Sequence, residues 1–177
     1  MTAFLAYFPL LVLVATAATI DWRTRRIPNW LNVMTLLLGL GLSFQGTIHT
    51  SPAMAFAGLA VGFILLVPAF ALGAMGGGDV KLLTAIGAWT GPLGAVVVLI
   101  VASLVGMVIA LAQAAQSGKL SALLRNSTVL AINLVNARSV GADHIEQTGK
   151  GFRSIDRPLP YAVPMLAGVI VWVALRW

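Results

Sequence analysis

Two aspartates are the residues best suited to chemistry in this chain. Of its 177 residues only five are acidic, and Asp21 and Asp79 each lie at the edge of a long apolar run. An ionisable side chain at a membrane segment is costly, so it indicates a functional site. Two carboxyl groups held close together share one proton, because ionising both is expensive. Such a pair can hydrolyse a peptide, with the ionised group taking a proton from water and the protonated group polarising the carbonyl.

A run of three glycines precedes the second aspartate, in the order Gly76-Gly77-Gly78-Asp79. Glycine weakens helices and admits positive φ. The run therefore predicts that the backbone bends at this point or approaches another group closely. A plainer interpretation stays open, in which the glycines form a flexible turn and Asp79 is the N-cap of the next helix.

The first aspartate is followed by a basic cluster of Arg23, Arg25 and Arg26. Asp21 is therefore also open to a second interpretation, as an acid among lipid headgroups that neutralises part of this cluster. The cluster itself is typical of topology determinants and lipid contacts.

Two further features flank the aspartates. Pro28 and Asn29 predict a turn followed by the start of a helix. Lys81, two residues after Asp79, is interpreted as a topology residue, with help in ionising Asp79 as the alternative.

The composition indicates a polytopic membrane protein. The chain is 59% hydrophobic and 9% charged, with a mean hydropathy of +0.97, whereas soluble domains are about a quarter charged. A net charge of +6 would suggest nucleic acid in a soluble protein. Here the basic residues cluster between apolar runs, where they meet lipid headgroups, so we expect membrane lipid as a partner and no nucleic acid.

Metal and cofactor chemistry is not expected. The chain has no cysteine, which excludes disulfides, thiolate metal sites and cysteine nucleophiles. Its two histidines, His49 and His144, lie in separate predicted loops without a cluster of the metal-ligand type.

The apolar runs predict an all-α membrane bundle of six spans forming a single domain, residues 1–177. A span needs roughly 17 to 25 apolar residues, so the apolar region from Val80 to Ala115 is too long for one, and Gly91 and Pro92 mark a break within it. The predicted spans are 3–20, 30–44, 53–75, 80–89, 95–115 and 161–177. A cytoplasmic segment, 118–159, with an interfacial helix and a loop, separates the last two. Five tryptophans near the predicted boundaries are expected to be interfacial anchors: Trp22, Trp30, Trp89, Trp172 and Trp177.

The distribution of basic residues predicts the orientation. The first apolar run has no Lys or Arg before it and is interpreted as a retained span, not a signal peptide. With both termini outside, all of the eleven basic residues except Arg176 face the cytoplasm, as the positive-inside rule requires. Asp21 and Asp79 then both lie at the cytoplasmic boundary.

These motifs together resemble the prepilin peptidases of the type IV pilin system, which are membrane aspartic proteases with a GxGD motif. The resemblance rests on Asp21 with Arg23, on Ile27-Pro28-Asn29-Trp30-Leu31, on Gly76-Gly77-Gly78-Asp79-Val80-Lys81-Leu82-Leu83, and on Leu159-Pro160-Tyr161-Ala162-Val163-Pro164. It is closest to the short forms associated with Flp-type tight-adherence pili.

The resemblance implies a catalytic pair and a substrate. Asp21 and Asp79 would activate a water molecule and cleave the basic leader from a prepilin at the cytoplasmic face of the bacterial inner membrane. The glycine run, Lys81, Pro28 and Asn29 would support the motif. Larger members carry a cytoplasmic domain with paired CxxC motifs and also N-methylate the product. With no cysteine and only about 20 residues before Asp21, this chain is not expected to be a methyltransferase.

Two other classes of function remain as alternatives. A small proton- or ion-coupled transporter would use the same carboxylates as a relay, and a non-catalytic subunit of a pilus assembly machine would need no chemistry. Transport predicts polar residues deep in several spans, and the first five predicted spans have no charge apart from the region of Asp21 and Asp79. The sequence therefore favours the protease.

Overall fold

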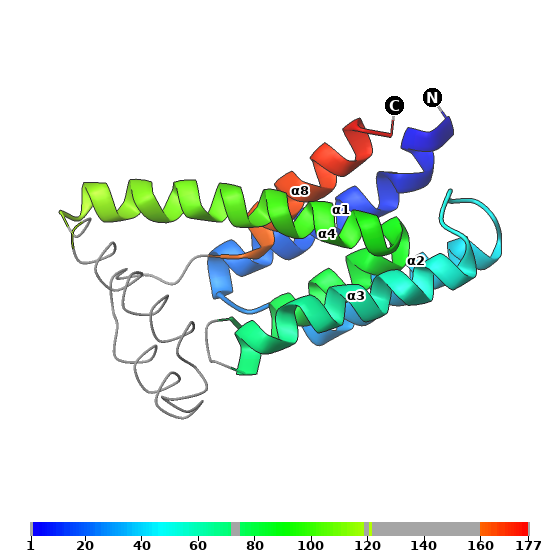
Figure 1. Ribbon diagram of the computed structural model, residues 1–177, viewed down its shortest axis with the longest axis horizontal. Helices are drawn as coiled ribbons and strands as arrows, with labels where there is room; N and C mark the ends of the chain where they lie inside the picture. Colours follow the sequence, from blue (N-terminus) through cyan, green and yellow to red (C-terminus); the bar gives the residue numbers. More distant parts are fainter. Residues whose placement is uncertain (1, 72–74, 119–120, 122–159, 177) are drawn as a thin grey trace, which may run out of the picture.

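The structure is a computed structural model that describes residues 2–71, 75–118, 121 and 160–176. Within these residues the chain folds into α-helices: α1 (Thr2–Thr24), α2 (Asn29–Phe44), α3 (Pro52–Ala71), α4 (Gly77–Gln116) and α8 (Ala162–Ala174). Figure 1 shows these helices packed side by side, with both termini near the same end of the bundle. The predicted all-α class is confirmed. The predicted interfacial helix and loop at 118–159 lie almost entirely outside the described residues.

The helices do not support the predicted count of six spans. Two of them, α3 and α4, are long and apolar enough to cross a membrane by length and composition. The predicted spans 80–89 and 95–115 both fall within α4, so the described residues form five helices where the sequence predicts six spans.

The long helix α4 is nevertheless not straight. Its 40 residues would extend about 60 Å as one rod, twice the hydrocarbon thickness of a bilayer. At Gly91 the backbone leaves the helical region, with φ 74° and ψ −178°, and Pro92 follows. Only glycine adopts such a φ without strain. The chain bends where the sequence predicts a turn, although the helical assignment continues through it.

The two limbs of α4 on either side of Gly91 pack against different partners. Gly87 in the first limb lies against Gly58 of α3, and Val98 in the second lies against Gly168 of α8. Figure 1 shows the second limb running back from the bend. In consequence α4 contacts every other described helix and forms the centre of the bundle.

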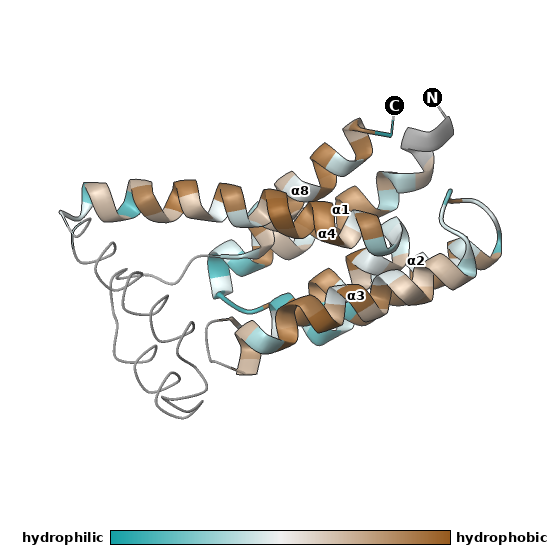
Figure 2. Cartoon of the chain, viewed as in Figure 1, coloured by the Kyte–Doolittle hydropathy of each residue, from teal (hydrophilic) through white to brown (hydrophobic). Residues whose placement is uncertain are grey.

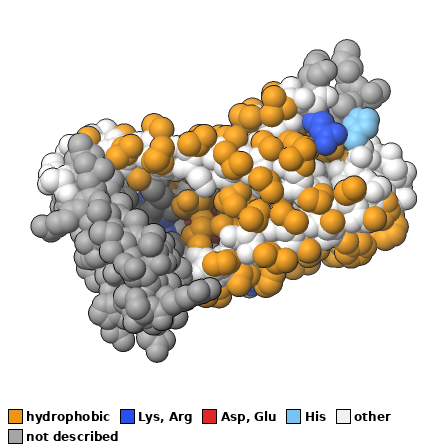
Figure 3. All heavy atoms as spheres, in the orientation of Figure 1, with side chains coloured by type: hydrophobic (Ala, Val, Ile, Leu, Met, Phe, Trp, Pro, Cys, Tyr) orange, Lys and Arg blue, Asp and Glu red, His pale blue; other side chains and the backbone are white. Residues whose placement is uncertain are grey.

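The outer surface of the bundle is strongly apolar. Large hydrophobic side chains are exposed on several helices, among them Phe44, Ile64 and Val108. Hydropathy is high along the helices in Figure 2, and hydrophobic side chains spread over the visible surface of the described helices in Figure 3. Soluble monomers rarely expose a continuous apolar surface of this kind, so the surface fits a membrane protein.

The end of the bundle far from the aspartates is held by a buried tryptophan. The Trp89 side chain is fully buried, and its indole Nε1 donates to the Thr35 carbonyl at 2.7 Å. The hydroxyl of Thr50 donates to the Trp89 carbonyl at 2.6 Å. The prediction of an interfacial anchor is therefore wrong for Trp89, because Gly39 of α2 leaves room for its ring inside the bundle. It is also wrong for Trp172, which is buried in the core. Trp22 and Trp30, at 61% and 60% exposure, do lie on the surface.

We expect Gly58→Ala to destabilise the protein. A methyl group there would collide with the backbone of Gly87 and Gly91, and backbone atoms have little freedom to move aside. Overpacking of this kind costs about 1 to 3 kcal/mol. Gly41→Ala is the matched control, since a methyl group there meets nothing within 4 Å. Thermal unfolding of both variants in detergent tests this, and equal midpoints for the two would contradict it.

Candidate active site

Asp21 lies inside the last turn of α1, which continues past the predicted end of the first span. Its side chain is only 6% exposed, and its Oδ2 accepts the backbone N–H of Ala162, the first residue of α8, at 3.2 Å. The first N–H groups of a helix have no partner within the helix and lie at the positive end of its dipole. Asp21 therefore satisfies a free donor of α8, and α8 in turn compensates a buried carboxyl group.

Asp79 is the third residue of α4. Its Oδ2 accepts the backbone N–H of Gly76 at 3.3 Å, and its own backbone N–H donates to the Gly76 carbonyl at 3.1 Å. The N-cap of α4 is Gly76, so the alternative in which Asp79 is the N-cap is wrong. Its carboxyl group reaches back to the N-cap backbone, as the acidic residue of a capping box does.

The structure places the two carboxyl groups at the same end of the bundle, within electrostatic range of each other. Asp21 and Asp79 belong to different helices. The helix α8 packs against both α1 and α4. Tyr161, the N-cap residue of α8, lies within electrostatic range of Asp79, next to the N–H that binds Asp21. The start of α8 thus adjoins both aspartates.

The residues at the start of α8 had no role in the sequence-based prediction. Tyr161 and Ala162 were noted only as part of the segment that carries the family resemblance. A helix start after Pro160 is a recognisable source of free N–H donors. The sequence offered no sign that the acceptor would be a carboxylate 141 residues away.

The sharp turn after Asp21 brings the chain against the glycine run. Arg25 has φ 56°, an uncommon conformation for a residue other than glycine. Its N–H donates to the Asp21 carbonyl at 2.9 Å, which closes α1. Ile27 follows, buried, and a methyl group on Gly78 would lie 3.3 Å from its Cβ. Close approach at Gly78 is therefore observed, and the approaching group is Ile27.

The alternative reason for the glycine run, a positive φ, is wrong. Within the described residues the positive-φ glycines are Gly46, Gly91 and Gly118. A methyl group on Gly76 would lie 3.3 Å from Asp79 Oδ2, and one on Gly77 would lie 3.4 Å from the ring of Phe70. All three glycines make room for a neighbouring side chain.

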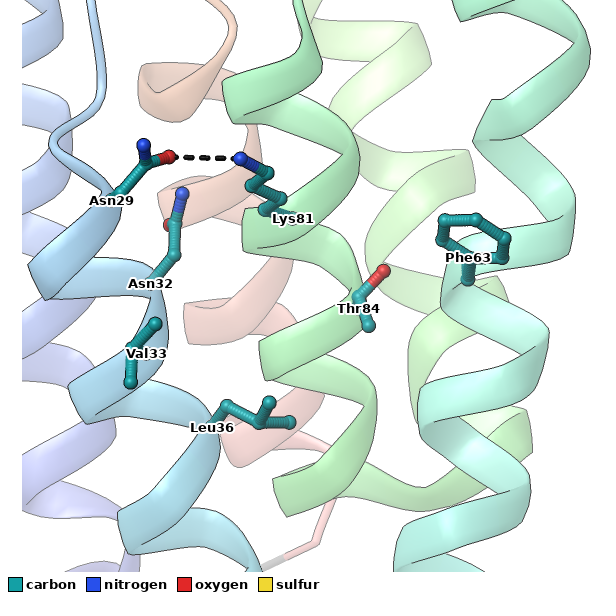
Figure 4. Close-up of a pocket in the computed structure, with 7 residues that line it drawn as sticks. All are labelled: Asn29, Asn32, Val33, Leu36, Phe63, Lys81 and Thr84. Atoms are coloured by element: carbon teal, nitrogen blue, oxygen red, sulfur yellow. Dashed lines mark hydrogen bonds between the residues drawn. The ribbon is translucent and has the colours of Figure 1, made fainter.

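Lys81 and Asn29 form a contact between α2 and α4. The Lys81 ammonium donates to Asn29 Oδ1 at 2.9 Å, as the dashed line in Figure 4 shows. Pro28 is the N-cap of α2 and Asn29 its first residue, where the sequence predicts a helix start. Asn32, which the sequence did not single out, donates from Nδ2 to the Gly78 carbonyl at 3.4 Å. These side chains support the start of α4 from the side of α2.

The described residues hold no group of three His, Asp or Glu side chains arranged to bind a metal ion. The chemistry that this arrangement offers is that of two neighbouring carboxyl groups beside a helix N-terminus.

The proximity of the aspartates is testable by crosslinking, because the chain has no native cysteine. We expect the double variant Asp21→Cys, Asp79→Cys to be crosslinked within one molecule by a short bifunctional thiol-reactive reagent, such as a bis-methanethiosulfonate. The matched control pairs Asp21→Cys with Lys81→Cys. Residue 81 follows 79 by two positions, so its side chain lies about 200° around the helix. Equal crosslinking of both pairs, or crosslinking of 21 to 79 only with long reagents, would contradict the arrangement.

Comparison with known proteins agrees with the motifs. The model of the type IV leader peptidase family matches residues 8–111, a segment that contains both aspartates, the glycine run and the residues between α1 and α2. Searches of curated proteins and of solved structures give no match. The matched segment covers more than half of the 177 residues. The resemblance to prepilin peptidases is confirmed, and the chain belongs to the type IV leader peptidase family.

Proposed function

We propose that this protein is a membrane-embedded aspartic endopeptidase that removes the basic leader from type IV prepilins of the Flp-like class. The observation that supports the proposal is that Asp21 and Asp79 lie within electrostatic range of each other at one end of the bundle, inside the segment that matches a leader peptidase family. The proposal does not include methyltransferase activity.

The two carboxyl groups would work as a pair that shares one proton. The ionised group takes a proton from a water molecule held between them, and the water oxygen attacks the scissile carbonyl. The protonated group donates a hydrogen bond to the carbonyl oxygen as negative charge develops on it. Collapse of the tetrahedral intermediate transfers a proton to the leaving amine and breaks the peptide bond. Because the pair titrates as a unit, acid and base are roles of the pair.

The surroundings of the pair favour chemistry at this point. Asp21 is buried and held by the Ala162 N–H, which fixes its orientation. Asp79 is only partly buried, so it is the member of the pair more open to a substrate. It lies in the first turn of a helix, near unpaired backbone N–H groups.

The topology belongs to the same proposal. The two limbs of α4 would count as separate spans, the first of them short, giving six spans with both termini outside. The Arg23, Arg25 and Arg26 cluster would then face the cytoplasm, together with the aspartates. A prepilin has a basic leader and an apolar helix, so its cleavage site would reach the same boundary of the bacterial inner membrane.

We expect Asp21→Asn and Asp79→Asn each to lower prepilin processing by at least roughly a hundredfold, as loss of an acid–base group does. Asparagine keeps the size of the side chain and an oxygen acceptor, so the Ala162 contact and membrane insertion should persist. Cleavage of a co-expressed Flp-type prepilin, followed by gel mobility, measures the effect. Asp143→Asn is the control, an aspartate outside the pair. Near-normal processing by either variant of the pair would refute the dyad.

We expect Gly78→Ala to lower processing by roughly ten- to a hundredfold while leaving membrane insertion intact. The added methyl group presses on Ile27 and displaces the segment that follows Asp21, and small misplacements of catalytic groups have effects of this size. Gly41→Ala, with open space around its methyl group, should retain full activity. Full processing by Gly78→Ala would show that this contact is not needed to position the pair.

A further inference from the structure

A cavity lies between α2, α3 and α4, on a different side of α4 from the aspartates. Its volume is about 290 Å³, near the lower end of the range for small-molecule sites. Figure 4 shows that Asn29, Asn32 and Lys81 gather at one end of it, whereas Leu36 lies further along α2. The cavity therefore has a polar end, close to the start of α4, and an apolar end.

Asn32 lines this cavity and carries an acceptor without a hydrogen-bond partner. Its side chain is 4% exposed, and its Nδ2 donates to the Gly78 carbonyl. Its Oδ1 is buried without a hydrogen-bond partner. An unsatisfied buried acceptor is costly, and native structures contain few of them. A ligand with a hydroxyl or N–H donor would satisfy it.

Lys81 supplies the positive charge at the same end. It is exposed, and its ammonium group has three donors, of which the bond to Asn29 uses one. The remaining donors suit a phosphate group. The polar end of the cavity is thus lined by a cation and by the side chain that carries the unpartnered acceptor.

The apolar lining points to an acyl chain. Val33 and Phe63 line the cavity, and each is 51% exposed, so the cavity opens onto the apolar outer surface of the bundle. A peptide bound here would bring many backbone donors and acceptors to an apolar wall that cannot satisfy them. A hydrocarbon chain brings none.

We propose that this cavity binds an anionic phospholipid whose headgroup carries a hydroxyl group, as phosphatidylglycerol does. The phosphate contacts Lys81, the headgroup hydroxyl donates to Asn32 Oδ1, and the first part of one acyl chain lies along Val33, Leu36 and Phe63. The Asn32 side chain also binds the Gly78 carbonyl, so the lipid completes the support of the glycine run that precedes Asp79.

Native mass spectrometry of the purified protein in detergent tests the role of Lys81. With phosphatidylglycerol, phosphatidylethanolamine and phosphatidylcholine as probes, we expect phosphatidylglycerol to bind most tightly. Lys81→Gln should weaken its binding roughly tenfold, the scale of a charge-assisted hydrogen bond, and Lys81→Arg should retain it. Arg26→Gln is the control. Arg26 is an exposed cation between α1 and α2, and it does not line the cavity.

Asn32→Leu tests the hydroxyl contact and removes the acceptor without adding charge. It should lower the affinity for phosphatidylglycerol while circular dichroism shows an unchanged helix content. Unchanged affinity in both Lys81→Gln and Asn32→Leu would overturn the proposal.

A photo-crosslinking residue at Val33 identifies the occupant in cell membranes. An adduct with the mass of phosphatidylglycerol, reduced by Lys81→Gln, would support the proposal, whereas a polypeptide as the main adduct would overturn it. No assay here includes a substrate, so the outcome is independent of peptidase activity.

Discussion

The hydrogen bond between the buried Asp21 carboxyl group and the first N–H of α8 determines how the helices around the candidate site pack. Removing a carboxylate from water is expensive unless donors replace the lost hydration. Asp21 finds its donor on a helix from the opposite end of the chain. To supply it, α8 must lie against both α1 and the second limb of α4, and this places Tyr161 near Asp79. The site is therefore complete only when the last described helix is docked.

Glycines allow this arrangement of helices. In a membrane, apolar burial does not drive helices together, and small residues at their contacts allow close packing instead. Gly58 and Gly87 bring α3 against the first limb of α4, and Gly168 brings α8 against the second. Gly91 joins the two limbs. Glycine thus allows close packing inside the bundle and the bend at one end of it. At the other end, glycine allows the close approach of Ile27.

The sequence predicted the helical class, the starts of most helices and the location of the two aspartates at the same end of the bundle. These depend on local signals: long apolar runs, Pro28 before a helix, and glycines before an acid. It did not predict that α1 would continue past Asp21, because the turn is closed by Arg25 in a conformation that arginine seldom adopts. It also placed Trp89 at the membrane surface, because the space for its ring is left by Gly39 of another helix.

Contacts between distant segments were the least predictable part of the site. Tyr161, Ala162 and Asn32 acquire their roles from partners on other helices, and a single sequence contains no signal for such pairs. The proposed catalytic role of Asp21 and Asp79 rests on chemistry and on family membership, whereas their location at one end of the bundle is a property of the fold.

The first limb of α4 is held by different hydrogen bonds at its two ends. Buried hydrogen bonds of Trp89 and Thr50 hold one end. The other end begins at glycines and is held by the longer bond from Asn32 and by the exposed bond between Lys81 and Asn29. Ten residues of helix, about 15 Å, separate Asp79 from Trp89. A tilt of roughly 4° about Trp89 moves the carboxyl group by about 1 Å, using the same rise per residue. A tilt of this size would change the separation of the two aspartates while leaving the buried hydrogen bonds of Trp89 in place.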